Sequence, residues 1–183
     1  STFGVPGVSE NAYFLKTLEE AVALKNHIIC CFETASRETD AEKRKALLTF
    51  VIVGGGATGV EYSGALSELI HGPLRKDYPS IDFSEVRILL LEAADYLVGP
   101  MPENLRTYTA EQLHRMGADV RLKTAVAEVT PEKVILKPGR ERSRPFPTTQ
   151  DDTINSNTVV WTAGVRGEDL PGLSGKIGRA SGR

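Results

Sequence analysis

A run of closely spaced glycines is the feature of this sequence that points most directly to chemistry. The pattern G-x-G-x-x-G occupies residues 54–59, immediately after the apolar run at 48–53 and at the start of a helical pattern. In such a turn the backbone can come close to a pyrophosphate, and the first N–H groups of the helix can hold the anion. The alternative is a glycine-rich turn without a ligand, and the flanking strand and helix argue against it. The predicted cofactor-binding residues are Gly54, Gly55, Gly56, Ala57, Thr58 and Gly59.

An acidic residue at the end of a second strand completes the pattern of a dinucleotide site. Glu92 closes the run RILLLE, where it can accept hydrogen bonds from the adenosine ribose. It comes later than the roughly 20 residues usual after the motif, and the extra segment at 72–85 accounts for the delay. Residues 93–95 contain no Arg or Lys, so a 2′-phosphate would find no cationic partner and NAD(H) is favoured over NADP(H). The other interpretation of Glu92 is a strand-end carboxylate that faces solvent.

Glu61, Ala163 and Gly164 are the remaining candidates for the site. In the first turn of the helix, Glu61 would gain a few tenths of a kcal/mol to about 1 kcal/mol from the helix dipole, and it would also face the cleft. Both interpretations of Glu61 stay open. Ala163 and Gly164 end the run VVWTAG, and an open α/β sheet has its ligand crevice at the carboxyl ends of its strands. They are predicted to line the site, and the alternative for Gly164 is a plain turn residue.

No metal site or catalytic triad is predicted. His27, His71 and His114 share no spacing with one another or with acidic residues that would produce one. Cys30 and Cys31 are adjacent, which fits neither a metal nor a redox motif and favours a reducing compartment.

The elements that position these residues follow from hydrophobic periodicity. Apolar residues at helical spacing predict a long amphipathic helix over 11–37, and Asp40 is a good N-cap for a short second helix. The residues expected on the inner face of the first helix are Phe14, Leu18, Val22, Ile28 and Phe32. The elements expected next are a buried strand at 48–53, a helix over 58–70, an irregular or broken-helical segment over 72–85 and a second strand at 86–91.

A third helical and strand unit and a series of short strands follow. Pro102 and the C-cap Gly117 bound a helix before a third strand at 119–122. The residues expected on the inner face of this helix are Leu105, Tyr108, Leu113 and Met116. Strand–helix–strand–helix–strand predicts a Rossmann-like α/β fold, a parallel sheet with helices on its faces. Segments 125–130, 133–137 and 157–164 predict an attached antiparallel β-meander, with a loop of no assigned role over Pro138–Asn157.

The length and composition of the chain fit one domain, and they argue against a nucleic-acid partner and a membrane-spanning helix. Its expected parts are a helical segment 1–47, a nucleotide-binding core 48–166 and a flexible tail 167–183. Because 22 Lys and Arg nearly balance 24 Asp and Glu, a nucleic-acid partner is not expected. The apolar runs are far shorter than the roughly 20 residues of a membrane-spanning helix, and no signal peptide is recognised, so a cytoplasmic protein is expected.

Four segments together resemble one known family. TFGVPGVSENAYFLKTLEEAVALKNHI, VIVGGGATGVEYSGALSEL, LLLEA and VVWTAGVRG resemble type II NADH dehydrogenases, single-subunit flavoproteins that oxidise NADH and reduce quinone. The resemblance covers nearly the whole chain up to about Arg166. It implies that the glycine motif binds the NADH pyrophosphate and that Glu92 binds the adenosine ribose. It also implies that Ala163 and Gly164 line the nicotinamide side, and that Glu61, the candidate catalytic residue, lies near the nicotinamide–flavin junction.

The sequence departs from this family in what surrounds the domain. No flavin-type glycine motif precedes the long helix, and neither a flavin-binding segment nor a membrane-binding region follows VVWTAGVRG. We therefore expect an NADH-binding domain excised from a larger flavoprotein, with FAD and the quinone contacts in the missing part and no turnover by this chain alone. The full-length protein is expected to be a homodimer at the inner face of a membrane.

Two other functions stay open. The chain could be the NAD(H)-binding domain of another pyridine-nucleotide flavoprotein, such as a ferredoxin or disulfide reductase. It could also be a non-catalytic NAD(H)-sensing module, for which a large exposed apolar patch would be evidence.

Overall fold

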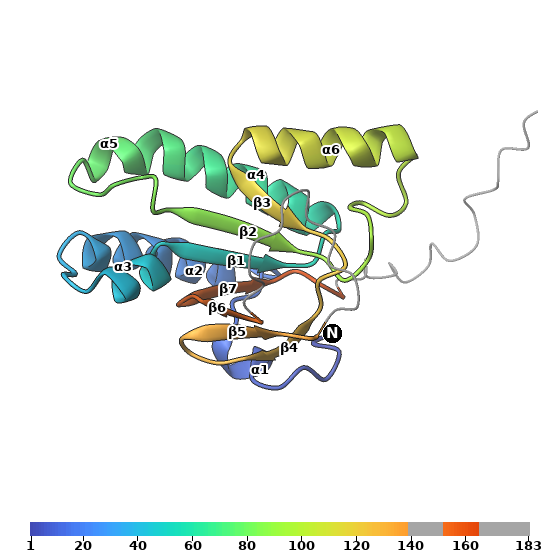
Figure 1. Cartoon of the computed structure of the whole chain (residues 1–183), viewed down its shortest axis with the longest axis horizontal. Coiled ribbons are helices and arrows are strands. Elements are labelled where there is room, and N and C mark those ends of the chain that lie inside the picture. Colours follow the sequence, from blue (N-terminus) through green and yellow to red (C-terminus); the bar gives the residue numbers. More distant parts are fainter. Residues whose placement is uncertain (139–151, 165–183) are drawn as a thin grey trace, which may run out of the picture.

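Four parallel strands form the centre of the molecule (Figure 1). The computed structural model describes residues 1–138 and 152–164. The strands are β1 (Thr49–Val53), β2 (Arg87–Leu91), β3 (Ala118–Arg121) and β7 (Thr158–Trp161), in the order β3-β2-β1-β7. Every residue of β1 is buried, as expected for a central strand that is covered on both faces.

Three helices cover one face of this sheet. They are α2 (Leu18–Ala35), α4 (Ala57–Leu69) and α6 (Glu103–Arg115). Because side chains alternate along a strand, Phe50 and Ile52 of β1 point to the helices while Val51 and Val53 point away. The core between the helices and the sheet includes Leu24, Ile28, Phe32, Phe50, Ile52, Leu66, Leu90 and Leu113.

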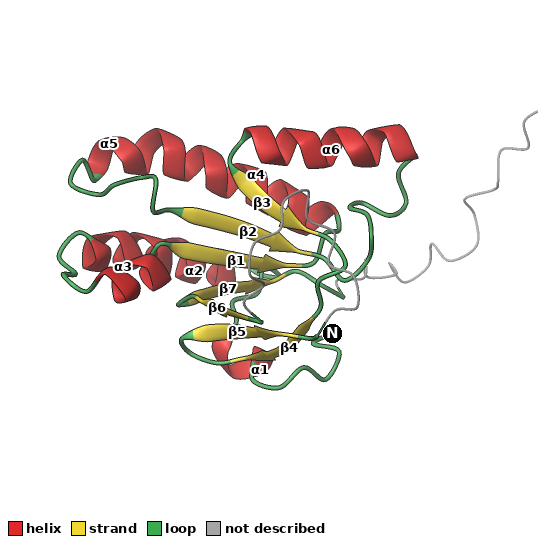
Figure 2. Cartoon of the chain, in the orientation of Figure 1, coloured by secondary structure: helices red, strands yellow, loops and turns green. Residues whose placement is uncertain are grey.

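An antiparallel sheet covers the opposite face, as Figure 2 shows for the strands of the lower layer. Its strands are β4 (Val126–Val129), β5 (Lys133–Leu136) and β6 (Thr153–Asn155), and the short helix α1 (Val8–Asn11) packs beside β4. The second core includes Val51, Val53, Leu89, Leu91, Val126, Val134, Leu136 and Ile154. The predicted parallel sheet with an attached meander is confirmed. The helices of the core lie on one face, because the meander occupies the other.

The single long helix predicted over 11–37 is wrong. Helix α1 ends at Asn11 and α2 begins at Leu18, and the residues between them run alongside β7. The backbone N–H of Tyr13 donates to the carbonyl of Val159 over 2.8 Å, and the N–H of Trp161 donates to the carbonyl of Tyr13 over 2.8 Å. These bonds extend the edge of the parallel sheet by one bridge, which a helix could not do.

Helix α2 begins at a capping box, and its first turn is more exposed than the sequence predicted. The side chain of Thr17 accepts from the N–H of Glu20, whose carboxylate in turn accepts from the N–H of Thr17. Leu18 and Val22, predicted to face inward, are 76% and 48% exposed, whereas Ile28 and Phe32 are buried as expected. The apolar stripe therefore begins one turn later than the periodicity suggested.

The C-terminal strands pair differently from the prediction. Segment 157–164 was expected in the meander, but β7 pairs in parallel with β1 in the main sheet. The third meander strand is β6, which lies in the region expected to be a loop. Ser156 separates β6 from β7, and its hydroxyl donates to the carbonyl of Thr49 over 2.6 Å, which ties the crossing point to β1. Residues 139–151, in the predicted loop Pro138–Asn157, and residues 165–183, which include the predicted tail 167–183, lie outside the described part of the chain.

The helix after the glycine motif is longer than expected. Helix α4 continues into the π-helical turn η1 (Ile70–Leu74) and the short α5 (Arg75–Asp77). The wider turn accommodates Pro73, whose ring would break a regular α-helix. The broken-helical part of the prediction is therefore confirmed for residues 72–77.

Two shorter predictions have mixed outcomes. Asp40 is the N-cap of α3 (Ala41–Leu47), as predicted. Its carboxylate accepts from the backbone N–H groups of Glu42 and Lys43. In α6, Leu113 is buried as predicted, but Leu105 and Tyr108 are 44% and 57% exposed. Gly117 follows the C-cap Met116 in the left-handed conformation.

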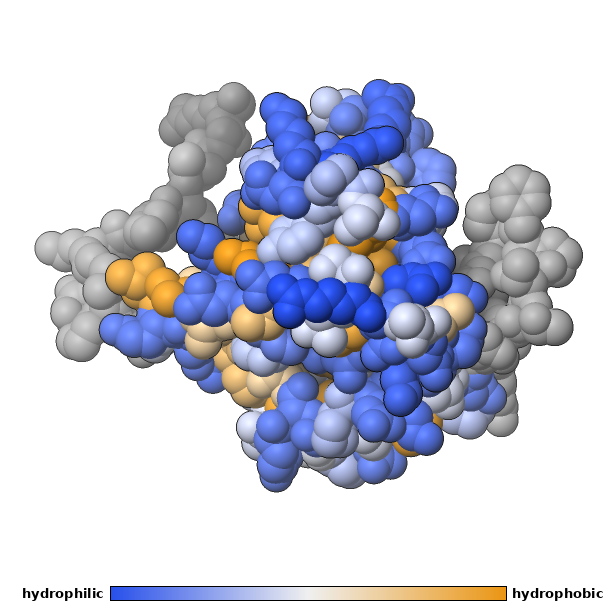
Figure 3. Space-filling view, turned by 90° about the vertical axis from the view of Figure 1, so that its left-hand side faces the viewer, coloured by the Kyte–Doolittle hydropathy of each residue, from blue (hydrophilic) through white to orange (hydrophobic). Residues whose placement is uncertain are grey.

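The surface at the amino ends of the parallel strands is mainly hydrophilic (Figure 3). Apolar residues form narrow areas between charged ones on this face. No helix within residues 1–138 and 152–164 is both long enough and apolar enough to cross a membrane.

His27 gives the fold a pH dependence that can be measured. Its Nε2 lies 3.2 Å from the carbonyl of Asn157, and its ring stacks on Tyr13. Burial lowers the pKa of His27 below its ordinary value, and the hydrogen bond to Asn157 opposes this only partly. The folded protein thus resists a proton that the unfolded chain accepts below about pH 6.5, so the free energy of unfolding should fall as the solution is acidified.

We expect His27→Gln to reduce the loss of stability between about pH 7.5 and about pH 5.5, measured by urea denaturation at each pH. His114→Gln, at an exposed position of α6, is the matched control and should keep the wild-type pH dependence. An unchanged pH dependence in His27→Gln would contradict the assignment.

Candidate dinucleotide site

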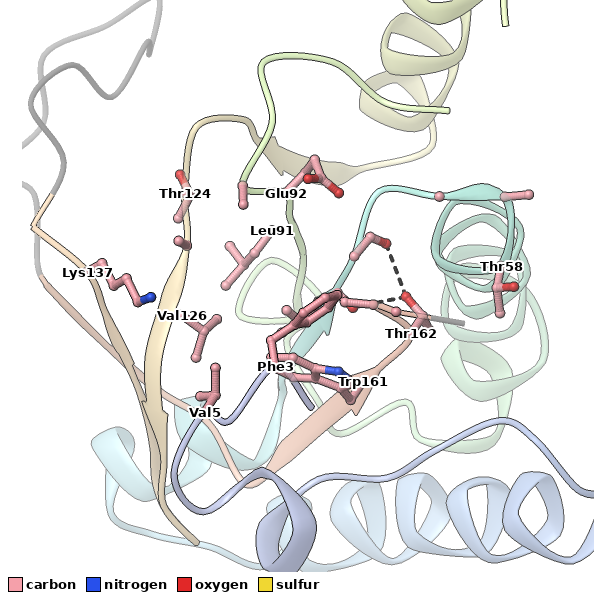
Figure 4. A pocket seen from close by; sticks show the side chains of 18 residues that line it. Phe3, Val5, Thr58, Leu91, Glu92, Thr124, Val126, Lys137, Trp161 and Thr162 are labelled. Carbon is pink, nitrogen blue, oxygen red and sulfur yellow. Dashed lines mark hydrogen bonds between the residues drawn. The ribbon is translucent and has the colours of Figure 1, made fainter. Parts of the chain in front are cut away.

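A cavity of about 640 Å³ opens at the carboxyl ends of β1, β2 and β7 (Figure 4). The turn after β1 and the start of α4 form one wall, and β4 with the end of β5 forms another. The charged residues that line it in the described part of the chain are Glu92 and Lys137, and most other lining residues are small or apolar. A cavity of this size at this edge of a parallel sheet is the usual location of a ligand in an open α/β fold.

Gly54 and Gly59 are required by close packing at the junction of β1 and α4. Gly54 has φ of +114°, and a Cβ there would lie 2.6 Å from the backbone nitrogen of Ala163. A Cβ at Gly59 would lie 1.9 Å from the carbonyl oxygen of Gly54. The first glycine therefore makes the turn, and the last allows the helix to approach the strand, as the motif predicts.

The surroundings of Gly56 are different, because no atom of residues 1–138 and 152–164 lies within 4 Å of a Cβ placed on it. It is the N-cap of α4 and, with Ala57 and Thr58, lines the cavity. In the described part of the chain no side chain caps the N-terminus of α4, so its first N–H groups receive no side-chain acceptor there. Gly is an accepted N-cap residue, but no close contact among the described residues requires one here, and the open space beside a helix N-terminus is what a pyrophosphate would need.

Glu92 is held at the rim of the cavity by two backbone donors. One carboxylate oxygen accepts from the N–H of Gly55 over 2.6 Å, and the other accepts from the N–H of Ala94 over 2.7 Å. Gly55 itself packs against this side chain, since a Cβ on Gly55 would lie 3.0 Å from the Cβ of Glu92. The carboxylate is thus fixed beside the glycine turn, and the solvent-facing interpretation of Glu92 does not describe it.

The predicted residues divide into those that line the cavity and those that do not. The lining residues are Gly54, Gly56, Ala57, Thr58, Glu92, Ala163 and Gly164. Gly55 and Gly59 do not line the cavity, and they pack closely against Glu92 and the carbonyl of Gly54, respectively. Glu61 is exposed, lies beyond the first turn of α4 and is not among the lining residues, so the first-turn interpretation of Glu61 is wrong. Gly164 has φ of +71°, so it is a turn residue and a lining residue at once.

Several lining residues were missed by the sequence analysis. The hydroxyl of Thr162 is shared between the carbonyls of Val53 and Gly54, at 3.0 and 3.1 Å, and joins the end of β7 to the glycine turn. A polar residue directly after a buried strand was the available signal for it. Phe3, Trp161 and Lys137 also line the cavity, and no spacing in the sequence connects them with the motif. Within residues 1–138 and 152–164, no group of three or more His, Cys, Asp or Glu is placed to hold a metal ion.

The parallel sheet, the glycine turn at its carboxyl edge and the fixed acidic residue at the end of β2 together define a dinucleotide-binding domain. The chain belongs to the pyridine nucleotide-disulphide oxidoreductase family, which matches residues 1–177.

The proteins that this chain resembles include NADH dehydrogenases and quinone oxidoreductases. The chain is 37% identical over 166 residues to a probable NADH dehydrogenase of Dictyostelium discoideum, and 34% identical over 170 residues to the type II NADH:quinone oxidoreductase Ndh of Mycobacterium tuberculosis. It covers 34% and 35% of these two proteins, and they cover 90% and 93% of it. Among solved structures, NDH2 from Plasmodium falciparum in complex with NADH matches with a TM-score of 0.79 at 22% identity, over 90% of this chain and 32% of that one. The chain thus spans about a third of the length of these proteins.

The contrast between two glycines tests the geometry of the turn. Gly59→Ala should lower the free energy of unfolding by about 1–3 kcal/mol or more, because its methyl group would occupy the position of a backbone carbonyl. Gly56→Ala adds a methyl group into open space at a φ of −73°, so it should cost less than about 1 kcal/mol. Urea denaturation of both variants measures the difference, and equal midpoints would contradict the close packing at Gly59.

Proposed function

We propose that this chain binds NADH and is the NADH-binding domain of an enzyme that passes a hydride from NADH to FAD and electrons on to quinone. The observation that carries the first part is the empty space at Gly56, which opens into a cavity beside the N-terminus of α4. The names of the sequence relatives, which are NADH dehydrogenases and quinone oxidoreductases, support the second part.

The dinucleotide would lie along the carboxyl edge of the sheet. Its pyrophosphate would contact residues 54–58, and its adenosine ribose would bond to Glu92. The nicotinamide half would extend towards Ala163 and Gly164. Glu61 would act near the nicotinamide–flavin junction only if the flavin approaches α4 from outside the cavity, since its side chain is exposed.

The described residues offer a dinucleotide site for NADH but no second glycine turn for FAD. The sequence has one G-x-G-x-x-G motif, and the structure already uses it for the dinucleotide turn after β1. A bound FAD would supply the acceptor for the hydride, while the residues of this chain bind and orient NADH. We therefore propose that FAD and quinone bind to other parts of the enzyme, which we also propose to be a homodimer held peripherally on the inner face of a membrane.

The alternative of a ferredoxin reductase has weaker support. A ferredoxin reductase from Rhodopseudomonas palustris matches with a TM-score of 0.59 at 15% identity, which is a likeness of fold alone. The relatives named for quinone or ubiquinone reduction are 32–37% identical to this chain over the aligned residues. Sequence similarity therefore favours the quinone-reducing enzyme, and we have no observation that favours a non-catalytic sensor.

Calorimetric titration of the chain with NADH and with FAD tests the proposal. We expect NADH to bind, FAD not to bind, and Gly56→Ala to weaken NADH binding by about tenfold or more, because the methyl group would occupy the pyrophosphate position. Gly72→Ala is the matched control, since a Cβ there also has no atom of the described residues within 4 Å and the position is outside the cavity. Tight FAD binding, or equal NADH affinity in the two variants, would overturn the assignment of the motif.

Selectivity against NADPH tests the role of Glu92. The wild-type chain should prefer NADH, because the carboxylate repels a 2′-phosphate and accepts hydrogen bonds from a free ribose. Glu92→Gln should reduce the ratio of NADH to NADPH affinity by about tenfold, the size of effect expected for a charge-assisted hydrogen bond. Glu68→Gln, at an exposed position of α4, should leave the ratio unchanged. A ratio that does not respond to Glu92→Gln would show that another residue selects the ribose.

A further inference from the structure

Phe3 is an exposed aromatic residue inside the cavity. Its side chain is 68% exposed, although it lines the same cavity as the glycine turn (Figure 4). Its ring lies against Gly164, where a Cβ would be 3.0 Å from two of the ring atoms. The ring and the carbonyl of Ser1 thus occupy the space beside Gly164, shortly after the end of β7.

The backbone around Phe3 is held in place by bonds to both sheets. The indole N–H of Trp161 donates to the carbonyl of Ser1 over 3.1 Å, and the N–H of Val129 donates to the carbonyl of Pro6 over 3.0 Å. Phe3 itself has φ of 51°, a left-handed conformation that is costly for a residue with a side chain. The fold thus maintains an unfavourable backbone conformation and an exposed ring at one position, and neither contributes to the core.

The order of the strands indicates which part of a dinucleotide would meet this ring. The order is β3-β2-β1-β7, so the glycine turn after β1 lies between Glu92, at the end of β2, and the end of β7. A dinucleotide with its pyrophosphate at the turn and its adenosine ribose at Glu92 must extend its other half towards β7. Phe3 and Gly164 are located there, and the ring on that half is the nicotinamide.

We infer that Phe3 is a binding residue for the nicotinamide ring, which it contacts as an apolar wall beside Gly164. This inference rests on the proposed NADH-binding function. Aromatic rings favour offset-stacked or edge-to-face contacts with other planar rings, and a flat side chain with few rotamers loses little entropy on binding. Phe3 would then favour nucleotides that carry a nicotinamide over those that carry only the adenosine and ribose phosphates.

The test compares NADH with ADP-ribose, which keeps the adenosine, the pyrophosphate and the second ribose but lacks the nicotinamide. We expect Phe3→Leu to weaken NADH binding by about three- to tenfold, the size of an aromatic contact, and to leave ADP-ribose binding unchanged. Phe3→Tyr, which keeps the ring, should restore the NADH affinity. Tyr108→Leu removes an aromatic residue that is 57% exposed on α6, outside the cavity, and should change neither affinity.

Trp161 provides a second measurement in the same samples. It is the single tryptophan of the sequence and lines the cavity on the β7 side. Reduced nicotinamide absorbs where tryptophan emits, so bound NADH should quench Trp161 by energy transfer and ADP-ribose should not. Quenching titrations of the wild-type chain and of Phe3→Leu give the NADH affinity a second time, independently of calorimetry.

The outcomes separate this inference from the function on which it rests. If neither NADH nor ADP-ribose binds to the wild-type chain, the proposed function is wrong and this inference fails with it. If both bind and Phe3→Leu leaves the ratio of their affinities unchanged, the function stands and the inference is overturned. Loss of ADP-ribose binding in Phe3→Leu would also overturn it, because the residue would then support the cavity as a whole.

Discussion

The contact between Gly59 and the carbonyl of Gly54 is the constraint on which the rest of the site depends. Because no side chain separates them, α4 can begin directly above the end of β1 and direct its first N–H groups into the cavity. Thr162 joins the same carbonyl to the end of β7, so the turn is fixed from the neighbouring strand as well. The carboxylate of Glu92 bonds to the next residue, Gly55, from the strand on the other side. One turn is therefore held by three parallel strands.

The second layer of strands explains why the carboxyl edge is a cavity and not an open surface. A parallel sheet has two apolar faces, and here helices cover one face while the meander covers the other. Val126, at the start of β4, and Lys137, directly after β5, line the cavity on the side opposite the glycine turn. The same packing that buries the sheet thus gives the binding site its depth.

Much of the fold and part of the site could be predicted because the signals are local. The glycine motif, the N-cap at Asp40 and the acidic end of β2 depend on residues a few positions apart, and all three occur as expected. The errors concern pairing between distant segments. Tyr13 leaves a helical pattern because it bonds across to β7, and β7 joins β1 because a buried parallel partner was available there. Neither preference can be read from periodicity, and Phe3 was missed because its surroundings are created entirely by such long-range contacts.

The chemistry of the cavity is consistent with the role that we propose for this chain, which is to bind and orient NADH. Within the described residues, its lining includes one carboxylate, one ammonium group and otherwise backbone, hydroxyl and apolar groups, with no cluster that could hold a metal. Such a set can bind a dinucleotide and fix its orientation, but it lacks an acceptor for a hydride. The nicotinamide half would lie where β7 and the segment before α1 meet, and the side chain of Phe3 is an exposed aromatic group in that part of the cavity. If the reacting ring is to face an external flavin, the protein must hold its other side, and Phe3 beside Gly164 is the residue positioned to do so.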